Sequence, residues 1–427
     1  MKVLISAYAF NPSGSLKLHP GEDIVGWKLV EQIARFHDVT VITHTFNQKD
    51  VEEWRGRGEL ADIRVEYIAL PFRLRTLFYR LEIGQRIYYY LWQKAAWRRA
   101  KKLHREHDFD LAHHITFNND WIPSVIGSRI DIPFIWGPIG GGQKTPKSFL
   151  RIYPKSSRMA DAVRLFGQWI GRRLLPTRRR NVRRARAILV CNEETKNKMP
   201  VRFHSKVIYF PVNGIAENDV ALEPAGQRNG HSLTVICVGR LIHWKNFKTA
   251  VDVYADLQKN VPEATLKIIG SGPEEENLKR LVREYGLEEQ VSFVPWLARE
   301  ELLKHMRAAD VFLHPALREG GGAVIVEAMA CGLPVICLDN AGPGFHIHDN
   351  WGIKIEPRSP EFVRAAMTDE LIDLCKNREK RRRLGEAALR RVRDVYLWDR
   401  QGERMKELYM RILNDDSLAT WGKQDFY

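Results

Sequence analysis

"VFLHPALREGGGAVIVEAMACGLPVICL", residues 311–338, contains the local pattern that decides the fold. Its two ends, residues 311–317 and 333–338, are short apolar runs of the kind that form buried strands. Three consecutive glycines and an apolar helical segment, residues 323–332, separate them, and Gly332 suits the end of that helix. A strand, a glycine loop, a helix and a second strand predict parallel strands joined by a helical crossover.

A glutamate stands in the middle of this apolar helix. Glu327 has only Val, Ile, Ala and Met for three residues on either side, so the helix offers no polar face for it. A buried carboxylate requires hydrogen-bond donors because its desolvation is costly. At this point three environments stay open for Glu327: a pair of sugar hydroxyls, a nearby Lys or Arg, or partial exposure.

The glycines before the helix suit an anion site. Gly320, Gly321 and Gly322 carry no side chains that would keep a ligand away from their backbone amides. They also precede a predicted helix N-terminus, where the partial positive charge of the helix favours an anion. A phosphate group is therefore the expected ligand of this loop.

The same alternation of strands and helices extends through the second half. Strand patterns occur at residues 233–239, 264–270, 291–296 and 352–357, and helical patterns at residues 247–260, 273–286 and 299–309. Arg240 and Lys245 follow the first of these strands, where two cations could hold a diphosphate leaving group. Gly270 and Gly272 form a glycine turn after the next strand, a pattern that by itself often marks only a tight turn.

The first half follows the same plan. Strands are predicted at residues 2–10, 38–44, 63–70, 109–117, 132–142, 187–195 and 206–215, with a first helix at residues 22–36. The loop of residues 11–21 is long and rich in Pro and Gly, which is typical of a binding loop, and we assign Gly14 to ligand binding. The polar stretch of residues 217–232 predicts an interdomain linker. The 427-residue chain is thus predicted to form two doubly wound α/β domains with ligands outside the strand C-termini.

Four collinear motifs resemble one enzyme family. They are G-R-L-x-x-x-K at residues 239–245, G-S-G-P at 270–273, A-D-V-F-L-H-P at 309–315 and E-G-G-G-x-x-x-x-E-A-M-A-C-G-L-P-V-I at 319–336. Together they resemble the C-terminal half of the retaining glycosyltransferases of family four (group 1), densely from residue 233 to 357 and more loosely over residues 1–215. The resemblance implies the GT-B fold, in which two Rossmann-like domains face a central cleft.

The resemblance also implies domain roles. Residues 1–215 would bind the acceptor, and residues 216–397 would bind the nucleotide-sugar donor. The ending "YLWDRQGERMKELY" resembles the terminal helices of the family, so a helix at about residues 398–420 would pack back on the first domain.

Individual residues match the family's motifs. Arg240 and Lys245 match the basic pair that binds the donor diphosphate. Glu319 matches the glutamate that contacts the donor sugar, and Glu327 matches the one that holds the nucleotide ribose. Further positions would contact the sugar, the phosphates, the base or the ribose, namely Gly320, Gly321, Gly322, Ala323, Gly270, Gly272, Val294 and Pro295.

The N-terminal half departs from the family's D-x-x-H-x-H pattern. The chain has Asp110, His113 and His114, but Ile115 stands where the second histidine would approach the donor sugar. Adjacent residues on a strand point to opposite faces, so one histidine is expected to face the cleft and the other the core. We favour His114 slightly over His113, and either could instead be a structural residue. The glycines of "WGPIGGG", residues 136–142, end another strand at the same edge and are expected to close the cleft or to form a simple tight turn.

No metal or other cofactor is expected beside the nucleotide-sugar donor. Asp108 and Asp110 form a D-x-D pair, which binds a divalent metal in the other large glycosyltransferase fold. Here the pair precedes a strand, at the end away from the expected cleft, so we assign it no metal. The five cysteines are odd in number and lack a C-x-x-C pair, which favours reduced thiols in the cytoplasm. The apolar N-terminus is predicted to be a first strand rather than a signal peptide.

The net charge of +15 is concentrated in two segments. Residues 71–103 hold nine basic residues against Glu82, and residues 147–187 hold thirteen against Asp161. Both segments mix arginines with Tyr, Trp, Phe and Leu, as interfacial amphipathic helices do, which predicts attraction to anionic lipid headgroups at the inner face of a membrane. A solvated face or a pocket for an anionic acceptor is the alternative. No nucleic-acid recognition motif accompanies the charge, and no apolar run is long enough to span a membrane.

The resemblance implies a retaining glycosyltransferase that uses a UDP- or GDP-sugar to transfer a hexose-type sugar. Together with the basic segments, it predicts a lipid-linked acceptor in the synthesis of surface polysaccharide or glycolipid. The alternatives are a glycosyltransferase with a soluble small-molecule acceptor, and a non-catalytic relative that binds membranes or nucleic acid.

Overall fold

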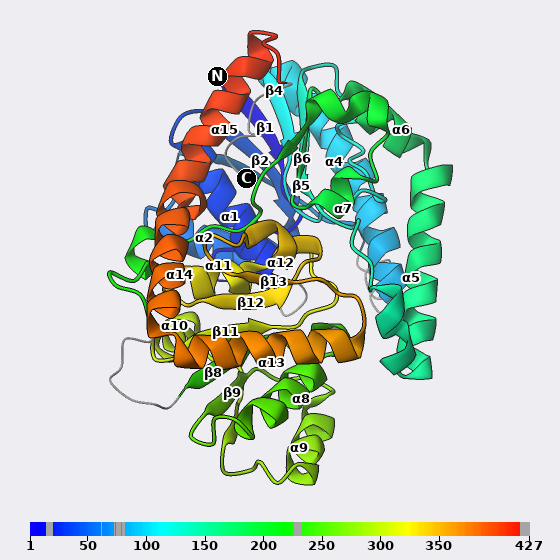
Figure 1. Cartoon of the computed structure of the whole chain (residues 1–427). Coiled ribbons are helices and arrows are strands. Elements are labelled where there is room, and N and C mark those ends of the chain that lie inside the picture. The colour runs from blue at the N-terminus through cyan, green and yellow to red at the C-terminus, as the bar shows by residue number, and fades with distance from the viewer. Residues whose placement is uncertain are drawn as a thin grey trace. The chain divides into compact units, whose positions relative to one another are not determined.

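The computed structural model of the chain describes residues 1–13, 20–60, 62–71, 73, 78, 82–225 and 233–418 (Figure 1). It contains two compact units. Unit 1 comprises Met1–Gly142, Val163–Val212 and Trp398–Tyr427, and unit 2 comprises Gln143–Ala162 and Asn213–Leu397. Gly14, which we assigned to ligand binding, lies outside the described residues.

The units are discontinuous in sequence. The chain passes from unit 1 to unit 2 between Val212 and Asn213, close to the expected boundary after residue 215. Residues 143–162, however, group with unit 2, although we expected them in the first domain. They do so because Phe149 and Tyr153 are buried in the apolar core of unit 2.

In the described part of unit 1, seven parallel strands form one sheet in the order β3-β2-β1-β4-β5-β6-β7. The strands are β1 (Lys2–Ser6), β2 (Asp38–His44), β3 (Arg64–Ile68), β4 (Leu111–His114), β5 (Phe134–Ile139), β6 (Ala187–Val190) and β7 (Val207–Tyr209). β1, β4, β5 and β6 are apolar and buried almost throughout, as expected for strands covered on both faces.

Helices connect the strands of unit 1. They are α1 (Pro20–Ala34), α2 (Gln48–Gly56), α4 (Glu82–His107), α5 (Lys155–Leu174), α6 (Pro176–Arg184), α7 (Glu193–Lys196) and α15 (Trp398–Leu413). α5 begins in unit 2 and ends in unit 1. α15 packs on α1, where Gly402 lies against Gln32, and it supplies Met405, Leu408 and Tyr409 to the core of unit 1.

The basic and aromatic segment of residues 71–103 is not a surface stripe over its described part. Its aromatic residues Tyr88, Tyr89 and Trp92, on α4, are fully buried against the sheet of unit 1. The Trp92 indole N–H donates to the Ile68 carbonyl oxygen at 2.9 Å. The prediction that these aromatics face a membrane is therefore wrong, because the arginine and aromatic spacing here reflects a helix with one buried face.

In unit 2, over the residues that the structure describes, six parallel strands follow the order β10-β9-β8-β11-β12-β13. They are β8 (Thr234–Val238), β9 (Thr265–Ile269), β10 (Val291–Val294), β11 (Val311–His314), β12 (Val335–Leu338) and β13 (Ile353–Ile355). In both sheets the strand order reverses direction once, between β1 and β4 in unit 1 and between β8 and β11 in unit 2. This is the doubly wound arrangement predicted from the sequence.

The helices of unit 2 enclose its sheet. They are α8 (Phe247–Gln258), α9 (Glu275–Glu284), α10 (Arg299–Arg307), α11 (Ala323–Ala330), α12 (Ala341–His346), α13 (Pro360–Lys376) and α14 (Arg378–Arg391), followed by a π-helical turn at Val392–Tyr396. α11 is the predicted apolar helix, and all of its residues except Ala323 and Glu327 are buried.

Candidate functional site

The candidate site in unit 2 lies where the strand order reverses. β8 and β11 are neighbours in the sheet but belong to opposite windings. In doubly wound sheets, ligands bind beyond the carboxyl ends of the strands at this reversal point. The loop after β8 carries Lys245, and the loop after β11 carries Glu319. Two residues 74 positions apart are brought together by this topology.

One carboxylate oxygen organises the centre of the site. Nζ of Lys245 lies 2.7 Å from Oε2 of Glu319, and Nε2 of His314 lies 2.6 Å from the same oxygen. Because a carboxylate only accepts, His314 carries its proton on Nε2. The Lys245 and Glu319 side chains are only 14% and 15% exposed, so water screens their attraction weakly.

The electrostatic surroundings keep Glu319 ionised. Burial acts to raise the pKa of Glu319, but Lys245 and His314 outweigh it and hold that pKa well below its usual range. Burial lowers the pKa of His314 despite the neighbouring carboxylate. Glu319 can therefore accept hydrogen bonds from substrate hydroxyls, but it is not suited to act as a general acid.

The glycine loop joins this centre to the N-terminus of α11. Gly322 adopts φ = +60°, a left-handed conformation that favours glycine, and the helix begins at the next residue. Gly320 and Gly321 are half-buried, and Ala323 is exposed. The loop therefore begins directly after Glu319 and ends at the positive end of the α11 dipole.

The carbonyl group of Gly321 is anchored from two sides. It accepts hydrogen bonds at 2.6 Å from the Asn213 side-chain amide and at 2.6 Å from Nε2 of His346. Burial lowers the pKa of His346 to about 4, so the ring is neutral, and its Nδ1 accepts from the Tyr396 hydroxyl at 2.8 Å. These contacts fix the orientation of the peptide group between Gly321 and Gly322.

The anchor leads to a stability prediction. Replacing His346 with Phe should lower the free energy of unfolding by about 1–3 kcal/mol, because two buried hydrogen bonds are lost, one from the Tyr396 hydroxyl and one to the Gly321 carbonyl oxygen. Urea unfolding measures this loss. His348→Phe is the matched control, because His348 lies two residues along the chain and its side chain is only half-buried. Equal losses in both variants would contradict the anchoring role.

Glu327 has a protein partner in the structure. Its Oε1 lies 2.5 Å from a terminal guanidinium nitrogen of Arg299. Nε of the same arginine lies 3.2 Å from Asp219. Burial raises the pKa of Glu327, and Arg299 acts against that shift. Of the three environments open from the sequence, the structure shows the pairing with an arginine. The Glu327 side chain is 15% exposed. A contact of Glu327 with the ribose stays a prediction.

The predicted nucleotide-binding positions follow neighbouring strands of unit 2. Gly270 and Gly272 come after β9, and the Gly270 amide donates to the Val294 carbonyl oxygen at the end of β10. A Cβ on Gly270 would lie only 2.0 Å from the Gly239 carbonyl oxygen, so close packing of the two loops already requires glycine there. Pro295 is exposed beside them.

Arg240, in the loop after β8, is exposed, in contrast to the largely buried Lys245. The structure thus gives the two predicted diphosphate ligands different environments. A role of Arg240 in donor binding stays a prediction.

The two histidines of unit 1 point to opposite faces of β4. Both nitrogens of His113 are occupied: Nε2 donates to the Gly137 carbonyl oxygen at 2.8 Å, and Nδ1 accepts from the Tyr409 hydroxyl at 2.7 Å. His114 bonds the Tyr89 hydroxyl through Nε2 at 2.8 Å, while its buried Nδ1 has no partner in the described part of the chain. Burial lowers the pKa of each ring to about 3. Both nitrogens of His113 are thus bound within the core, whereas His114 keeps one buried ring nitrogen without a partner among the described residues. A contact of His114 with a substrate stays a prediction.

The other expected features of unit 1 lie at opposite edges of its sheet. The glycines of residues 140–142 follow β5 at the carboxyl edge, where a Cβ on Gly142 would meet the Glu194 carbonyl oxygen at 2.4 Å. Asp108 and Asp110 precede β4 at the amino edge, where Asp110 accepts from the Lys2 backbone amide at 2.7 Å. Among the described residues, no three His, Cys, Asp or Glu side chains are grouped as metal ligands would be.

A buried carboxyl group lies at the start of α1, beside the loop that follows β1. Asp23 is 1% exposed, and its Oδ2 accepts no hydrogen bond within the described part of the chain. Burial raises the pKa of Asp23 to about 8, and the carboxylates of Glu22 and Asp50 add to the shift. Asp23 therefore carries its proton at neutral pH.

The raised pKa of Asp23 predicts that the free energy of unfolding falls as the pH rises. The unfolded chain releases the Asp23 proton near pH 4 and the folded chain only near pH 8, so the stability that Asp23 contributes is present at low pH and lost as pH rises between them. Asp23→Asn, which cannot ionise, should therefore gain at least about 1 kcal/mol over the natural chain between pH 5 and pH 8. Urea unfolding at both pH values measures this gain. A difference that does not change with pH would contradict the assignment.

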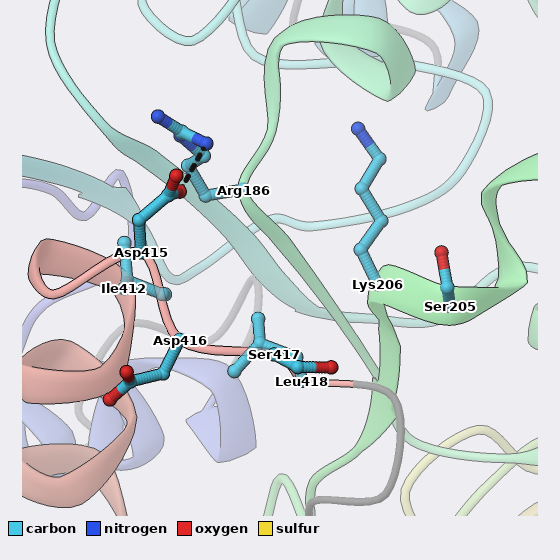
Figure 2. A pocket seen from close by; sticks show the side chains of 8 residues that line it. All are labelled: Arg186, Ser205, Lys206, Ile412, Asp415, Asp416, Ser417 and Leu418. Carbon is cyan, nitrogen blue, oxygen red and sulfur yellow. Dashed lines mark hydrogen bonds and ion pairs between the residues drawn. The ribbon is translucent and has the colours of Figure 1, made fainter.

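A pocket of about 200 Å³ opens elsewhere in unit 1, and none of the predicted site residues lines it (Figure 2). Arg186 and Asp415 form an ion pair at 2.7 Å on one side of it, and Lys206 lies on the other side. Lys206 donates to the Arg183 and Ala185 carbonyl oxygens. Arg186 and Asp415 thus bind each other, and Lys206 is bound to backbone carbonyl groups.

Sequence reasoning missed three residues of the unit 2 site. His314 stands at the end of a buried strand at the reversal point, and this position was the signal that could have identified it. Asn213 and His346 belong to no motif, because they support the loop through single hydrogen bonds from distant segments. No helix over the described ranges is both long and apolar enough to cross a membrane.

Comparisons with known proteins agree with this architecture. Residues 221–391 match the family model of the glycosyl transferases group 1. A protein of Mycobacterium tuberculosis named GDP-mannose-dependent alpha-(1-6)-phosphatidylinositol monomannoside mannosyltransferase is 29% identical over 275 residues, which are 58% of this chain and 70% of that protein.

Two solved structures share the fold. Sucrose-phosphate synthase from Thermosynechococcus elongatus has a TM-score of 0.63 at 19% identity, covering 97% of this chain and 100% of its own. HepE of Anabaena, solved with UDP and glucose, has a TM-score of 0.58 at 17% identity, covering 96% and 99%. The two doubly wound sheets are therefore those of the GT-B fold, residues 221–391 form a group 1 glycosyl transferase domain, and the chain is a glycosyltransferase.

Proposed function

We propose that the protein transfers a hexose-type sugar from a UDP- or GDP-sugar to a lipid-linked acceptor, with retention of the anomeric configuration, in the synthesis of a glycolipid or surface polysaccharide. The observation that carries the proposal is the convergence of Lys245, His314 and Glu319 on one oxygen atom, next to a glycine loop at a helix N-terminus. This arrangement offers a cation, an acceptor for sugar hydroxyls and an anion site within one loop system of unit 2.

Each part has a role in the proposed reaction. The Lys245 ammonium and the N-terminus of α11 neutralise the charge that develops on the diphosphate as the glycosidic bond breaks. Arg240 adds a second, exposed cation. Glu319, held ionised, orients the sugar through its hydroxyl groups, and Glu327 binds the ribose after Arg299 adjusts its position. The leaving diphosphate accepts the proton of the acceptor hydroxyl on the same face of the sugar, which gives retention.

Unit 1 supplies the acceptor side in this proposal. His114 is the histidine assigned to contact a substrate, because Nδ1 of His113 is already bound to Tyr409. The nearby loop after β1 and the start of α1 would contact the acceptor. Support for a lipid-linked acceptor comes from the relative whose name includes phosphatidylinositol monomannoside, and from the basic charge of residues 147–187. A peripheral position at the inner face of a membrane follows from such an acceptor.

Thermal denaturation in the presence of GDP, UDP and their hexose derivatives tests the donor assignment. A nucleotide present at about 100 times its dissociation constant should stabilise the protein by about 2.7 kcal/mol. The expected result is a clear shift with one nucleotide series and a smaller shift in the Lys245→Ala variant. If no nucleoside diphosphate or nucleotide-sugar shifts the transition, the proposed donor class is wrong.

A further inference from the structure

Helix α5 presents apolar side chains to solvent. Val163, Phe166, Trp169 and Leu174 are 56%, 62%, 52% and 63% exposed. Their spacing of three to five residues places them on one side of the helix, within the part of α5 that belongs to unit 1. The Phe166 and Trp169 rings are stacked with their centroids 6.0 Å apart. We call these four residues the exposed α5 face.

The opposite side of α5 is polar and packed against unit 1. Gly171 lies so close to the Trp121 backbone that a Cβ there would come within 2.3 Å of the carbonyl oxygen. Arg172 binds the fully buried Asp120 through two hydrogen bonds of 2.6 and 2.8 Å, and Gln168 is buried beside it. The helix is thus inverted relative to an ordinary surface helix, whose apolar side faces the core.

Polar contacts therefore set the position of α5, and its apolar side is exposed to solvent and open to a binding partner. A group of large exposed apolar side chains on one surface marks an interaction site rather than a random surface. α5 lies at the right-hand side of the view in Figure 1, and α6 follows it.

The charge around this face selects the partner. Residues 162–192 contain nine arginines and no acidic residue. Arg173, Arg179, Arg180 and Arg183 are exposed beside or directly after the face. Aromatic residues flanked by cations suit the interface of a bilayer, where rings enter the headgroup region and guanidinium groups meet phosphates.

We propose that the exposed α5 face docks into the surface of an anionic lipid bilayer. The inference rests on the proposed lipid-linked acceptor, and it assigns the contact to four apolar side chains and the arginines around them. The buried Arg172 and Asp120 pair holds the helix in place, so the face is presented without rearrangement of unit 1.

Vesicle sedimentation of the full chain tests the proposal. Vesicles of phosphatidylcholine alone are compared with vesicles that also contain phosphatidylglycerol, at about 0.15 M salt, where surface charges still act over roughly 8 Å. The natural chain should sediment with the anionic vesicles. Phe166→Glu should lower the partition coefficient at least about tenfold, because it removes an inserted ring and adds a charge that anionic lipid repels.

Val201→Glu is the matched control, because Val201 is an 80% exposed apolar residue of unit 1 outside α5. It adds the same charge and should leave vesicle binding unchanged. Trp169→Gln is a second variant that removes a ring without adding charge, and it should also weaken binding. Unchanged thermal transitions confirm that the variants fold.

Three results would overturn the docking proposal. In the first, the natural chain stays in solution with both kinds of vesicle. In the second, Phe166→Glu and Val201→Glu bind equally well. In the third, the natural chain is a dimer by gel filtration that Phe166→Glu dissociates, so that a second copy covers the face.

Turnover of nucleotide-sugar without vesicles separates this proposal from the proposed function. Normal turnover with no vesicle binding contradicts the docking alone. Vesicle binding without turnover of any nucleotide-sugar contradicts the proposed function alone.

Discussion

The Glu319→Gln variant is expected to lose at least about 10²-fold in kcat with a smaller change in KM for the donor. Glutamine keeps the size of the side chain but removes the charge that balances Lys245 at 2.7 Å and accepts from His314 at 2.6 Å. An interaction that strengthens as the sugar acquires positive charge affects kcat more than ground-state binding. Steady-state kinetics with the donor identified by thermal denaturation measures the effect.

Glu356→Gln is the control for this variant. Glu356 is an exposed carboxylate of unit 2 that pairs with Arg358 at the surface. Its replacement should leave kcat within about twofold, because exposed ion pairs contribute little. A Glu319→Gln enzyme with the kcat of the natural chain would remove Glu319 from the proposed mechanism.

Lys245→Ala should also lower kcat at least about 10²-fold, since the leaving diphosphate loses its buried cation. The loss should also weaken binding of the nucleoside diphosphate product. Lys248→Ala is the matched control and should be close to the natural enzyme, because Lys248 lies three residues along the chain with an exposed side chain that pairs with Asp252.

The double variant tests whether the two residues act as one unit. Because Lys245 and Glu319 share a direct ion pair, combining their substitutions should cost much less than the product of the two single losses. Strictly multiplicative losses would show that the pair acts as two independent groups. Full activity of Lys245→Ala would exclude it as the diphosphate ligand.

Much of the fold was predictable because both sheets are covered on two faces. Strands such as Val311–His314 then appear in the sequence as short continuous apolar runs, separated by helical patterns and glycine turns. The discontinuity of the units was not predictable, since Phe149 and Tyr153 enter the core of unit 2 from a segment that is basic overall. Burial of the α4 aromatics was also missed, because arginine and aromatic spacing looks alike on an interfacial helix and a half-buried one.

The candidate site was predictable where backbone chemistry imposes a motif. The glycines of residues 320–322 must leave room for a close approach, and Glu319 precedes them at a fixed distance along the chain. Partners that come from distant segments left no local signal, as the pairing of Arg299 with Glu327 and of His346 with Gly321 shows. The structural role of His113 depended on a hydrogen bond to Tyr409, almost 300 residues later in the chain.

The contribution of α15 to unit 1 has a consequence for the order of events during synthesis. Residues 1–142 of unit 1 are made before unit 2, yet the core of unit 1 includes Met405, Leu408 and Tyr409. The β4 histidine His113 cannot obtain its second hydrogen bond until Tyr409 has been made. Domains often fold in the order in which they are translated. Here synthesis of unit 1 begins before that of unit 2 and ends after it. The core of unit 1 therefore stays incomplete in the nascent chain until α15 has been made.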